Sequence, residues 1–316
     1  MTRILVTGGA GYVGSTATAI LADRGYEVVV FDDLSMGHAD AVDPRATLIE
    51  GTLLDPDALR AALVGCEAVI HFAGKSLVGE SVEKPDLYHH VNVDGTANLL
   101  DAMAIHGIDK IVFSSSAATY GQPVDDPITE ESVAAPTNPY GASKLAIDKM
   151  ITARGISAIS LRYFNVAGAY KSQNGWLAER HNPETHLIPL VLRATEENPL
   201  KIFGTDWDTK DGTCIRDYVH VVDLADAHLR ALDALKAGAH EIINLGSGGG
   251  YSVREVVTTS SKVVGYEITA VEVDRRAGDP AVLIASIEKA KSMLGWEPTR
   301  DLESMISDAY ESLKAV

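Results

Sequence analysis

The stretch that decides the fold is VTGGAGYVGS, residues 6–15, which continues the apolar run that begins at Ile4. Gly8, Gly11 and Gly14 give the spacing G-x-x-G-x-x-G between a predicted strand and a predicted helix. A tight turn needs the conformational freedom of glycine, a pyrophosphate needs backbone without Cβ atoms, and a helix N-terminus presents free N–H groups. The stretch therefore predicts a dinucleotide-binding turn after the first strand.

An acidic pair closes the second predicted strand. Asp32 lies 18 residues after Gly14, at the position from which a carboxylate accepts hydrogen bonds from the hydroxyls of a ribose. A 2′-phosphate would instead meet the negative charges of Asp32 and Asp33, and no arginine stands beside them. The pair favours NAD over NADP.

The first half of the chain alternates short apolar runs with helical segments. The runs RILVTG, EVVVF, TLIEG, EAVIH, KIVFSSS and AISLRYF are typical of buried parallel strands. Helices are expected to begin near Tyr12, Pro56, Pro85 and Pro139. This order predicts an α/β fold with a doubly wound parallel sheet of the Rossmann type.

The pattern changes after about Phe164, where a long polar stretch rich in Gly, Asn and Pro follows. We expect a cofactor-binding sheet domain over residues 1–164, which regains part of residues 217–245, and a smaller α/β substrate domain over residues 165–316. In the second domain we expect helices after Pro183, Val222, Ser252 and Asp301, with a capping box formed by Ser252 and Glu255.

Composition excludes several classes of partner. The net charge of −17, from 27 Lys and Arg against 44 Asp and Glu, repels nucleic acid and anionic lipid surfaces. Cys66 and Cys214 form no disulfide framework, which fits a reducing compartment. We find no run of 18 apolar residues and expect a cytoplasmic protein. The ten histidines show no H-E-x-x-H or Cys/His ligand spacing, so no metal site is predicted.

The stretch NPYGASK, residues 138–144, places a tyrosine and a lysine on one helical face. A phenol titrates near ~10 in water, so its use as a base needs a shift of roughly 3 units. The cations of Lys144 and of a nicotinamide ring favour the phenolate of Tyr140 by about that much. Ser116, at the end of a predicted strand, completes a candidate catalytic set.

TGGAGYVGS, SSSAATYG and YGASK together resemble the extended short-chain dehydrogenase/reductase superfamily. Within it, HFAG, NVDGT, LRYFNVAGA, DGTCIRDYVHVVDLADAH and RRAGD are similar to the UDP-glucose 4-epimerases. This resemblance implies reversible epimerisation of UDP-glucose and UDP-galactose at C4 through a transient 4-keto sugar and enzyme-bound NADH, in a homodimer. It also implies that Tyr140 is the general base, that Lys144 lowers its pKa and holds the nicotinamide ribose, and that Ser116 positions the sugar hydroxyl.

The same resemblance implies two sets of binding residues. The expected NAD-binding set is Gly8, Gly11, Tyr12, Val13, Gly14, Asp32, Asp33, Leu53, Phe72, Ala73, Gly74, Asn92, Lys144 and Phe164. The expected UDP-sugar set is Ser116, Tyr140, Asn165, His186, Leu187, Phe203, Arg216, Arg276, Asp279 and Leu283.

Three positions depart from the family pattern. Thr52 stands where an acidic residue often contacts adenine, and Ser76 stands where a lysine is common, with Lys75 one residue earlier. Leu283 is intermediate between the bulky tyrosine and the smaller residues that the family places there, so we expect poor or partial use of UDP-N-acetylhexosamines.

Three alternatives stay open at this point. One is a 4-epimerase of another UDP-sugar, such as UDP-glucuronate or UDP-arabinose. Another is a nucleotide-sugar dehydratase, although such enzymes usually place Asp-Glu where this chain has Ser115-Ser116-Ala117. The third, of a different class, is a non-catalytic NAD-binding regulator.

Overall fold

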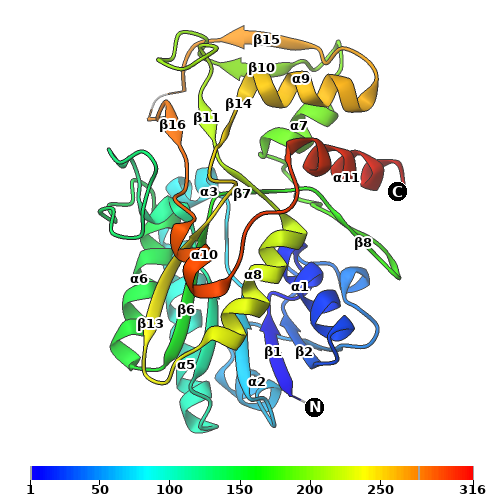
Figure 1. The fold of residues 1–316 in the computed structure, drawn as a ribbon. Helices are drawn as coiled ribbons and strands as arrows, with labels where there is room; N and C mark the ends of the chain where they lie inside the picture. The colour runs from blue at the N-terminus through cyan, green and yellow to red at the C-terminus, as the bar shows by residue number, and fades with distance from the viewer. Residues whose placement is uncertain (1, 277, 316) are drawn as a thin grey trace.

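The computed structural model describes residues 2–276 and 278–315. A parallel sheet of seven strands forms the centre of its larger unit (Figure 1). The strand order is β13-β6-β5-β4-β1-β2-β3, and every neighbouring pair runs parallel. The strands are β1 (Arg3–Thr7), β2 (Glu27–Asp32), β3 (Thr47–Glu50), β4 (Ala68–His71), β5 (Lys110–Ser114), β6 (Ser157–Tyr163) and β13 (His240–Leu245). All six predicted strands are confirmed, and with them the α/β fold class.

Helices cover both faces of this sheet (Figure 1). Side chains alternate along each strand, so Ile4 and Val6 of β1 pack into one core cluster and Leu5 packs into the other. The first cluster holds α1 (Tyr12–Asp23), α8 (Val221–Ala234) and α10 (Glu288–Leu294). The second holds α2 (Pro56–Ala62), α5 (Gly95–Ile105) and α6 (Pro139–Arg154). The helix starts expected at Tyr12, Pro56, Pro85 and Pro139 are confirmed.

Short helical turns follow β2 and β5 and connect β4 to α5. The segment expected to be a helix from Pro85 consists of a short helix, α4, and a π-helical turn, η2, that leads directly into α5. The connecting elements are η1 (Ala39–Ala41), α3 (Val78–Glu83), α4 (Pro85–Tyr88), η2 (His89–Asp94) and η3 (Ala117–Thr119).

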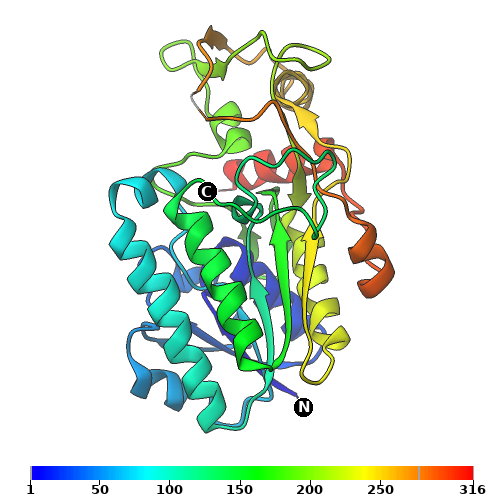
Figure 2. The same ribbon diagram turned by 90° about the vertical axis from the view of Figure 1, so that its left-hand side faces the viewer.

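A smaller unit lies above the carboxyl edge of the sheet (Figure 2). Its own apolar cluster includes Val191, Ile202, Val256 and Met305. Its elements are β7 (Asn165–Ala167), β8 (Tyr170–Ser172), β9 (Gly175–Leu177), α7 (Leu187–Leu192), β10 (Leu200–Phe203), β11 (Ile215–Arg216), β12 (Tyr218–His220), β14 (Tyr251–Ser252), α9 (Val253–Val264), β15 (Ala270–Val273), β16 (Val282–Leu283) and α11 (Leu302–Lys314).

The predicted helix starts in this half of the chain are close to the observed ones. Ser252 and Glu255 form the expected capping box of α9, and Asp301 caps α11. The helix expected after Pro183 begins at Leu187, and the one expected after Val222 begins at Val221.

Two features of this half differ from the sequence analysis. The polar stretch after Phe164 contains three short strands, and β8 pairs with β9 in a small antiparallel hairpin. Residues 240–245 lie in the range 217–245 that was expected to rejoin the sheet domain, but they form a strand that the apolar runs did not predict, β13, which pairs with β6 along its whole length. In the described ranges, every helix is too short or too polar to cross a membrane.

Candidate active site

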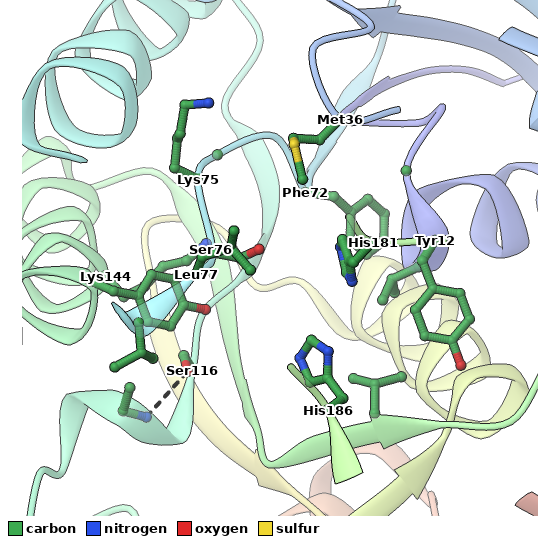
Figure 3. A pocket seen from close by; sticks show the side chains of 18 of the residues that line it. Tyr12, Met36, Phe72, Lys75, Ser76, Leu77, Ser116, Lys144, His181 and His186 are labelled. Atoms are coloured by element: carbon green, nitrogen blue, oxygen red, sulfur yellow. Dashed lines mark hydrogen bonds between the residues drawn. The ribbon is translucent and has the colours of Figure 1, made fainter. Parts of the chain in front are cut away.

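A cleft of about 890 Å³ runs along the carboxyl edge of the sheet, between the sheet and the smaller unit. It brings together most of the residues expected to bind NAD or a UDP-sugar (Figure 3). Those that line it are Gly8, Gly11, Tyr12, Val13, Gly14, Asp32, Asp33, Leu53, Phe72, Ala73, Gly74, Ser116, Tyr140, Lys144, Phe164, Asn165, His186, Arg216, Arg276, Asp279 and Leu283.

The glycine turn forms one end of the cleft. Gly8 has a φ of +71°, a conformation that favours glycine, and a Cβ on Gly14 would lie 2.1 Å from the carbonyl oxygen of Gly8. Only glycine therefore lets α1 start this close to the end of β1. The exposed backbone and the start of α1 form a cradle that fits a pyrophosphate.

Asp32 lies beside this turn because β1 and β2 are neighbours in the sheet. Its carboxylate accepts hydrogen bonds from the backbone N–H of Ala10 at 2.9 Å and of Leu34 at 2.9 Å. Burial raises the pKa of Asp32 above its usual value, while these two bonds oppose the shift. The side chain is held at the end of β2, where a ribose would reach it.

Helix α6 carries the tyrosine and the lysine, and its sequence explains its start and its position. The side chain of Asn138 accepts from the N–H of Gly141 at 2.8 Å, and Pro139 occupies the first turn. A Cβ on Gly141 would lie 2.3 Å from the carbonyl oxygen of Ala118. The missing side chain lets α6 pack tightly on the η3 turn, which brings Tyr140 close to Ser116.

Tyr140 is buried, with its ring 6.5 Å from the ring of Tyr88 in an edge-on contact. Burial raises the pKa of Tyr140 well above its ordinary value, Tyr163 adds to the rise, and hydrogen bonding with Ser116 opposes it. The lowering of this pKa expected from Lys144 together with a nicotinamide cation stays a prediction. In the protein alone, the cost of taking a phenolate out of water exceeds the stabilisation that the surrounding groups provide.

Lys144 is also buried, and its Nζ lies 5.9 Å from the centre of the Tyr140 ring. Nζ donates to the carbonyl oxygen of Ser114 at 2.8 Å, at the end of β5. Burial lowers the pKa of Lys144 to about 8, and the charge of Asp148, one turn further along α6, opposes that shift. The ammonium form is therefore still the main one at neutral pH.

The other end of the cleft carries two arginines. Arg216, on β11, lies 3.8 Å from the carboxylate of Asp279, and the guanidinium of Arg276 stacks on the ring of Phe203 at 4.2 Å. Leu283 follows on β16, which pairs with β11. Two guanidinium groups on a cleft wall provide the local positive charge that a diphosphate needs in a chain of net charge −17.

Three predicted residues are not among the described residues that line the cleft: Asn92, Leu187 and Phe203. Asn92 is buried. Its side-chain oxygen accepts from the backbone N–H of Lys75 at 2.7 Å, and its side-chain N–H donates to the backbone carbonyl of Lys75 at 3.0 Å, so Asn92 holds the loop after β4. Phe203 contacts Arg276, whose guanidinium stacks on its ring. The departures from the family pattern, Thr52, Lys75 and Ser76, do line the cleft.

Sequence reasoning missed a group of side chains on the wall between the two ends. Glu179 and His181 line the cleft, and Glu184 joins them next to His186. Burial would raise the pKa of Glu179, but its bonds to His181 and His186 lower it to about 2. Burial would lower the pKa of His186, but its bonds to the two carboxylates raise it to about 10. The spacing E-x-H-x-x-E-x-H was the available signal.

Comparison with known proteins agrees with this geometry. The model of the NAD dependent epimerase/dehydratase family matches residues 4–246. The UDP-glucose 4-epimerase of Corynebacterium glutamicum is 52% identical, over 99% of this chain and 96% of its own length. The chain belongs to the UDP-glucose 4-epimerase family.

Solved structures of this family share the fold. The UDP-glucose 4-epimerase of Brucella ovis in complex with NAD superposes with a TM-score of 0.94, at 43% identity, over 98% of both chains. The UDP-glucose 4-epimerase of Bifidobacterium longum in complex with NAD+ and UDP gives a TM-score of 0.91, at 35% identity, over 99% of this chain and 98% of that one. Full-length coverage at this identity extends the family assignment to both units of the chain.

Proposed function

We infer that this chain is an NAD-dependent epimerase that interconverts UDP-glucose and UDP-galactose by inverting C4 of the hexose. The observation that carries this inference is a single cleft with a dinucleotide turn at one end, two arginines at the other, and Tyr140, Lys144 and Ser116 between them. Family membership gives the same activity. We propose that residues 1–164 with part of 217–245 hold NAD, and that the remainder of residues 165–316 holds the UDP-sugar.

The cofactor site fits NAD on two observations. The turn between Gly8 and Gly14 is so tight that a Cβ on Gly14 would clash with the backbone of Gly8, and Asp32 is fixed beside it. NAD, when bound, supplies a hydride acceptor and donor and a positively charged ring. We propose that Lys144 holds the nicotinamide ribose of NAD. We also propose that the loop after β4, which Asn92 fixes, lies beside the pyrophosphate of NAD.

In the reaction, Tyr140 is proposed to remove the proton of the 4-hydroxyl as the hydride leaves C4, and to return it when the hydride comes back to the opposite face. Because burial keeps the phenol protonated in the protein alone, the added positive charge of the cofactor is what favours the phenolate. Ser116 is proposed to hold the sugar oxygen, and Lys144 contributes a nearby ammonium.

We propose that Arg216 and Arg276 bind the diphosphate of UDP, with Asn165 and Asp279 on either side. Rotation of the 4-keto sugar about its link to this fixed diphosphate presents its other face. No oxidation remains at the end of the cycle, because the hydride that leaves C4 also returns to it.

The site argues against the dehydratase alternative. Elimination of water needs a proton donor and acceptor beside C5 and C6. The residues that precede the η3 turn are Ser115 and Ser116, and the hydroxyl of Ser115 is turned into the core, where it donates to Asp148 at 3.2 Å. No carboxylate follows β5 at this point in the described chain.

The function is tested by denaturing the purified protein, assaying the released nicotinamide nucleotide, and following conversion of UDP-galactose to UDP-glucose with no NAD added. We expect released NAD and interconversion. Bound NAD without interconversion would contradict the proposed substrates, UDP-glucose and UDP-galactose, and would still support the proposed cofactor site. UDP-glucuronate and UDP-arabinose are then the substrates to assay.

Leu283 is expected to limit use of N-acetylated sugars. It lines the cleft on a strand whose backbone is fixed, since its carbonyl accepts from the N–H of Asp217 at 2.9 Å. We expect wild-type kcat/KM for UDP-GlcNAc to be at least about tenfold below that for UDP-glucose, and Leu283→Ala to reduce this gap by about tenfold. Robust turnover of UDP-GlcNAc by the wild type would contradict this expectation.

We also propose that the chain forms a homodimer through α5 and α6, which run side by side on one face of the sheet (Figure 2). Arg154 of α6 pairs with Asp101 of α5 at 2.6 Å, and Ile105 nearby is 66% exposed. Light scattering should give the mass of two chains, and Ile105→Glu should shift it toward one. A wild-type mass of one chain would refute the dimer.

A cytoplasmic location stays a prediction from the sequence.

A further inference from the structure

Four side chains with metal-binding chemistry gather on the segment between β9 and α7. One donor atom from each of Glu179, His181, Glu184 and His186 lies within 4.8 Å of the other three. Figure 3 shows the two imidazoles close together in the pocket, across from Lys144. Only His186 of the four belongs to the expected UDP-sugar set, and none of them is the proposed base or one of the two arginines proposed to bind the diphosphate.

The contacts inside this cluster are short. Oε1 of Glu179 lies 2.8 Å from Nδ1 of His181 and 2.6 Å from Nδ1 of His186. Oε1 of Glu184 lies 3.0 Å from the same Nδ1 of His186, and the two imidazole rings are 5.4 Å apart. The two imidazole nitrogens and the two carboxylate oxygens are therefore packed closely together.

Burial of the two carboxylates gives a second, independent indication of a ligand. The side chains of Glu179 and Glu184 are only 7% and 5% exposed. Oε1 of Glu184 accepts from the backbone N–H groups of Thr185 and His186, at 2.8 and 2.9 Å, whereas its buried Oε2 has no hydrogen-bond partner. An unpaired buried carboxylate oxygen is costly, and a cation would remove that cost.

We propose that Glu179, His181, Glu184 and His186 bind one divalent transition-metal ion of the zinc class. Two imidazole nitrogens and two carboxylate oxygens form a donor set that suits tetrahedral Zn²⁺, whereas Mg²⁺ and Ca²⁺ prefer oxygen donors alone. Zn²⁺ holds nitrogen and oxygen at about 2.0–2.2 Å.

Four protein donors leave no open position, which is typical of a structural ion. The ion fixes the segment that enters α7 and forms a wall of the cleft. Two other contacts already tie this region to the cofactor end: Tyr12 donates to the carbonyl of Gly168 at 2.5 Å, and Arg180 pairs with Asp40 at 2.9 and 3.0 Å. The positive charge of the ion also cancels two carboxylates beside a cleft that must accept diphosphates.

The site can be tested on the wild-type protein by measuring its metal content after purification without chelators. We expect about one zinc per chain. After dialysis against a chelator, adding Zn²⁺ alone should raise the Tm, and adding Co²⁺ should give the visible absorption of a tetrahedral complex. These readouts need no substrate, so they are independent of the proposed epimerase activity.

Two variants locate the ion. Glu184→Gln keeps the shape of the side chain, and His181→Ala removes one imidazole; both should abolish the Co²⁺ absorption and the Tm response to Zn²⁺. His106→Ala, an exposed histidine at the end of α5, is the matched control and should keep both. A wild type that retains no zinc and whose Tm does not respond to Zn²⁺ overturns the proposal. The cluster is then an imidazolium held between two carboxylates.

Discussion

Tyr140→Phe is expected to lower kcat for UDP-galactose by about 10³-fold, because positioned acid–base groups typically contribute 10²–10⁴-fold. The substitution removes only the phenol oxygen, so the buried ring keeps its contact with Tyr88 and the helix keeps its packing. We expect the variant to fold normally and to release as much NAD on denaturation as the wild type. Single-turnover rates, with the released cofactor measured in parallel, check both statements.

Ser116→Ala is the comparison variant for that experiment. Its hydroxyl accepts from the N–H of Ala118 at 3.1 Å and opposes the rise in the pKa of Tyr140, so its loss should reduce kcat less than the loss of the phenol. If Tyr140→Phe keeps kcat within about tenfold of the wild type, another group carries the proton and the assignment of the base is wrong.

Gly14→Ala is expected to give a protein that retains no NAD and shows no interconversion unless NAD is added in large excess. The new Cβ would lie 2.1 Å from the carbonyl oxygen of Gly8, an atom of the backbone that cannot rotate away. The turn must shift, and with it the cradle for the pyrophosphate. Forced packing of this kind costs about 1–3 kcal/mol of stability, which thermal unfolding will detect.

Gly249→Ala is the matched control for this variant. A Cβ at Gly249 meets no atom within 4 Å, and the residue does not need a positive φ. We expect wild-type retention of NAD and wild-type Tm from Gly249→Ala. Full retention of NAD by Gly14→Ala would show that the cofactor does not use this turn.

The sheet and its glycine turn were predictable because their signals are local. The six strands predicted from apolar runs are all present, and the turn follows β1 as expected. The strand β13 was missed because His240, Glu241 and Asn244 interrupt its apolar pattern, and only pairing with β6 places them in a sheet. The three-residue strands after Phe164 carry too few residues for any periodicity.

The residues of the candidate site could be predicted where they belong to a sequence motif. Properties that depend on burial, such as pKa values, could not be predicted. The residue types of Tyr140 and Lys144 and their spacing were readable from the chain, whereas the direction of the pKa shift of Tyr140 depends on how completely α6 is covered. The cluster of Glu179, His181, Glu184 and His186 has the spacing E-x-H-x-x-E-x-H, which matches neither H-E-x-x-H nor a Cys/His ligand pattern. Asn92 proved to be a support of the loop after β4, a role that needs coordinates.

The return of the chain to the main sheet has a consequence for folding. Strand β6 ends at Tyr163, but its outer neighbour β13 begins at His240, after β7 to β12 of the smaller unit and α8 have been made. During synthesis the edge of β6 stays open until the chain has passed Leu245, so the nascent sheet exposes an unpaired strand edge for that interval. Such long-range pairing slows folding. A chaperone that shields this edge should raise the yield of folded protein more than one that acts on the finished chain.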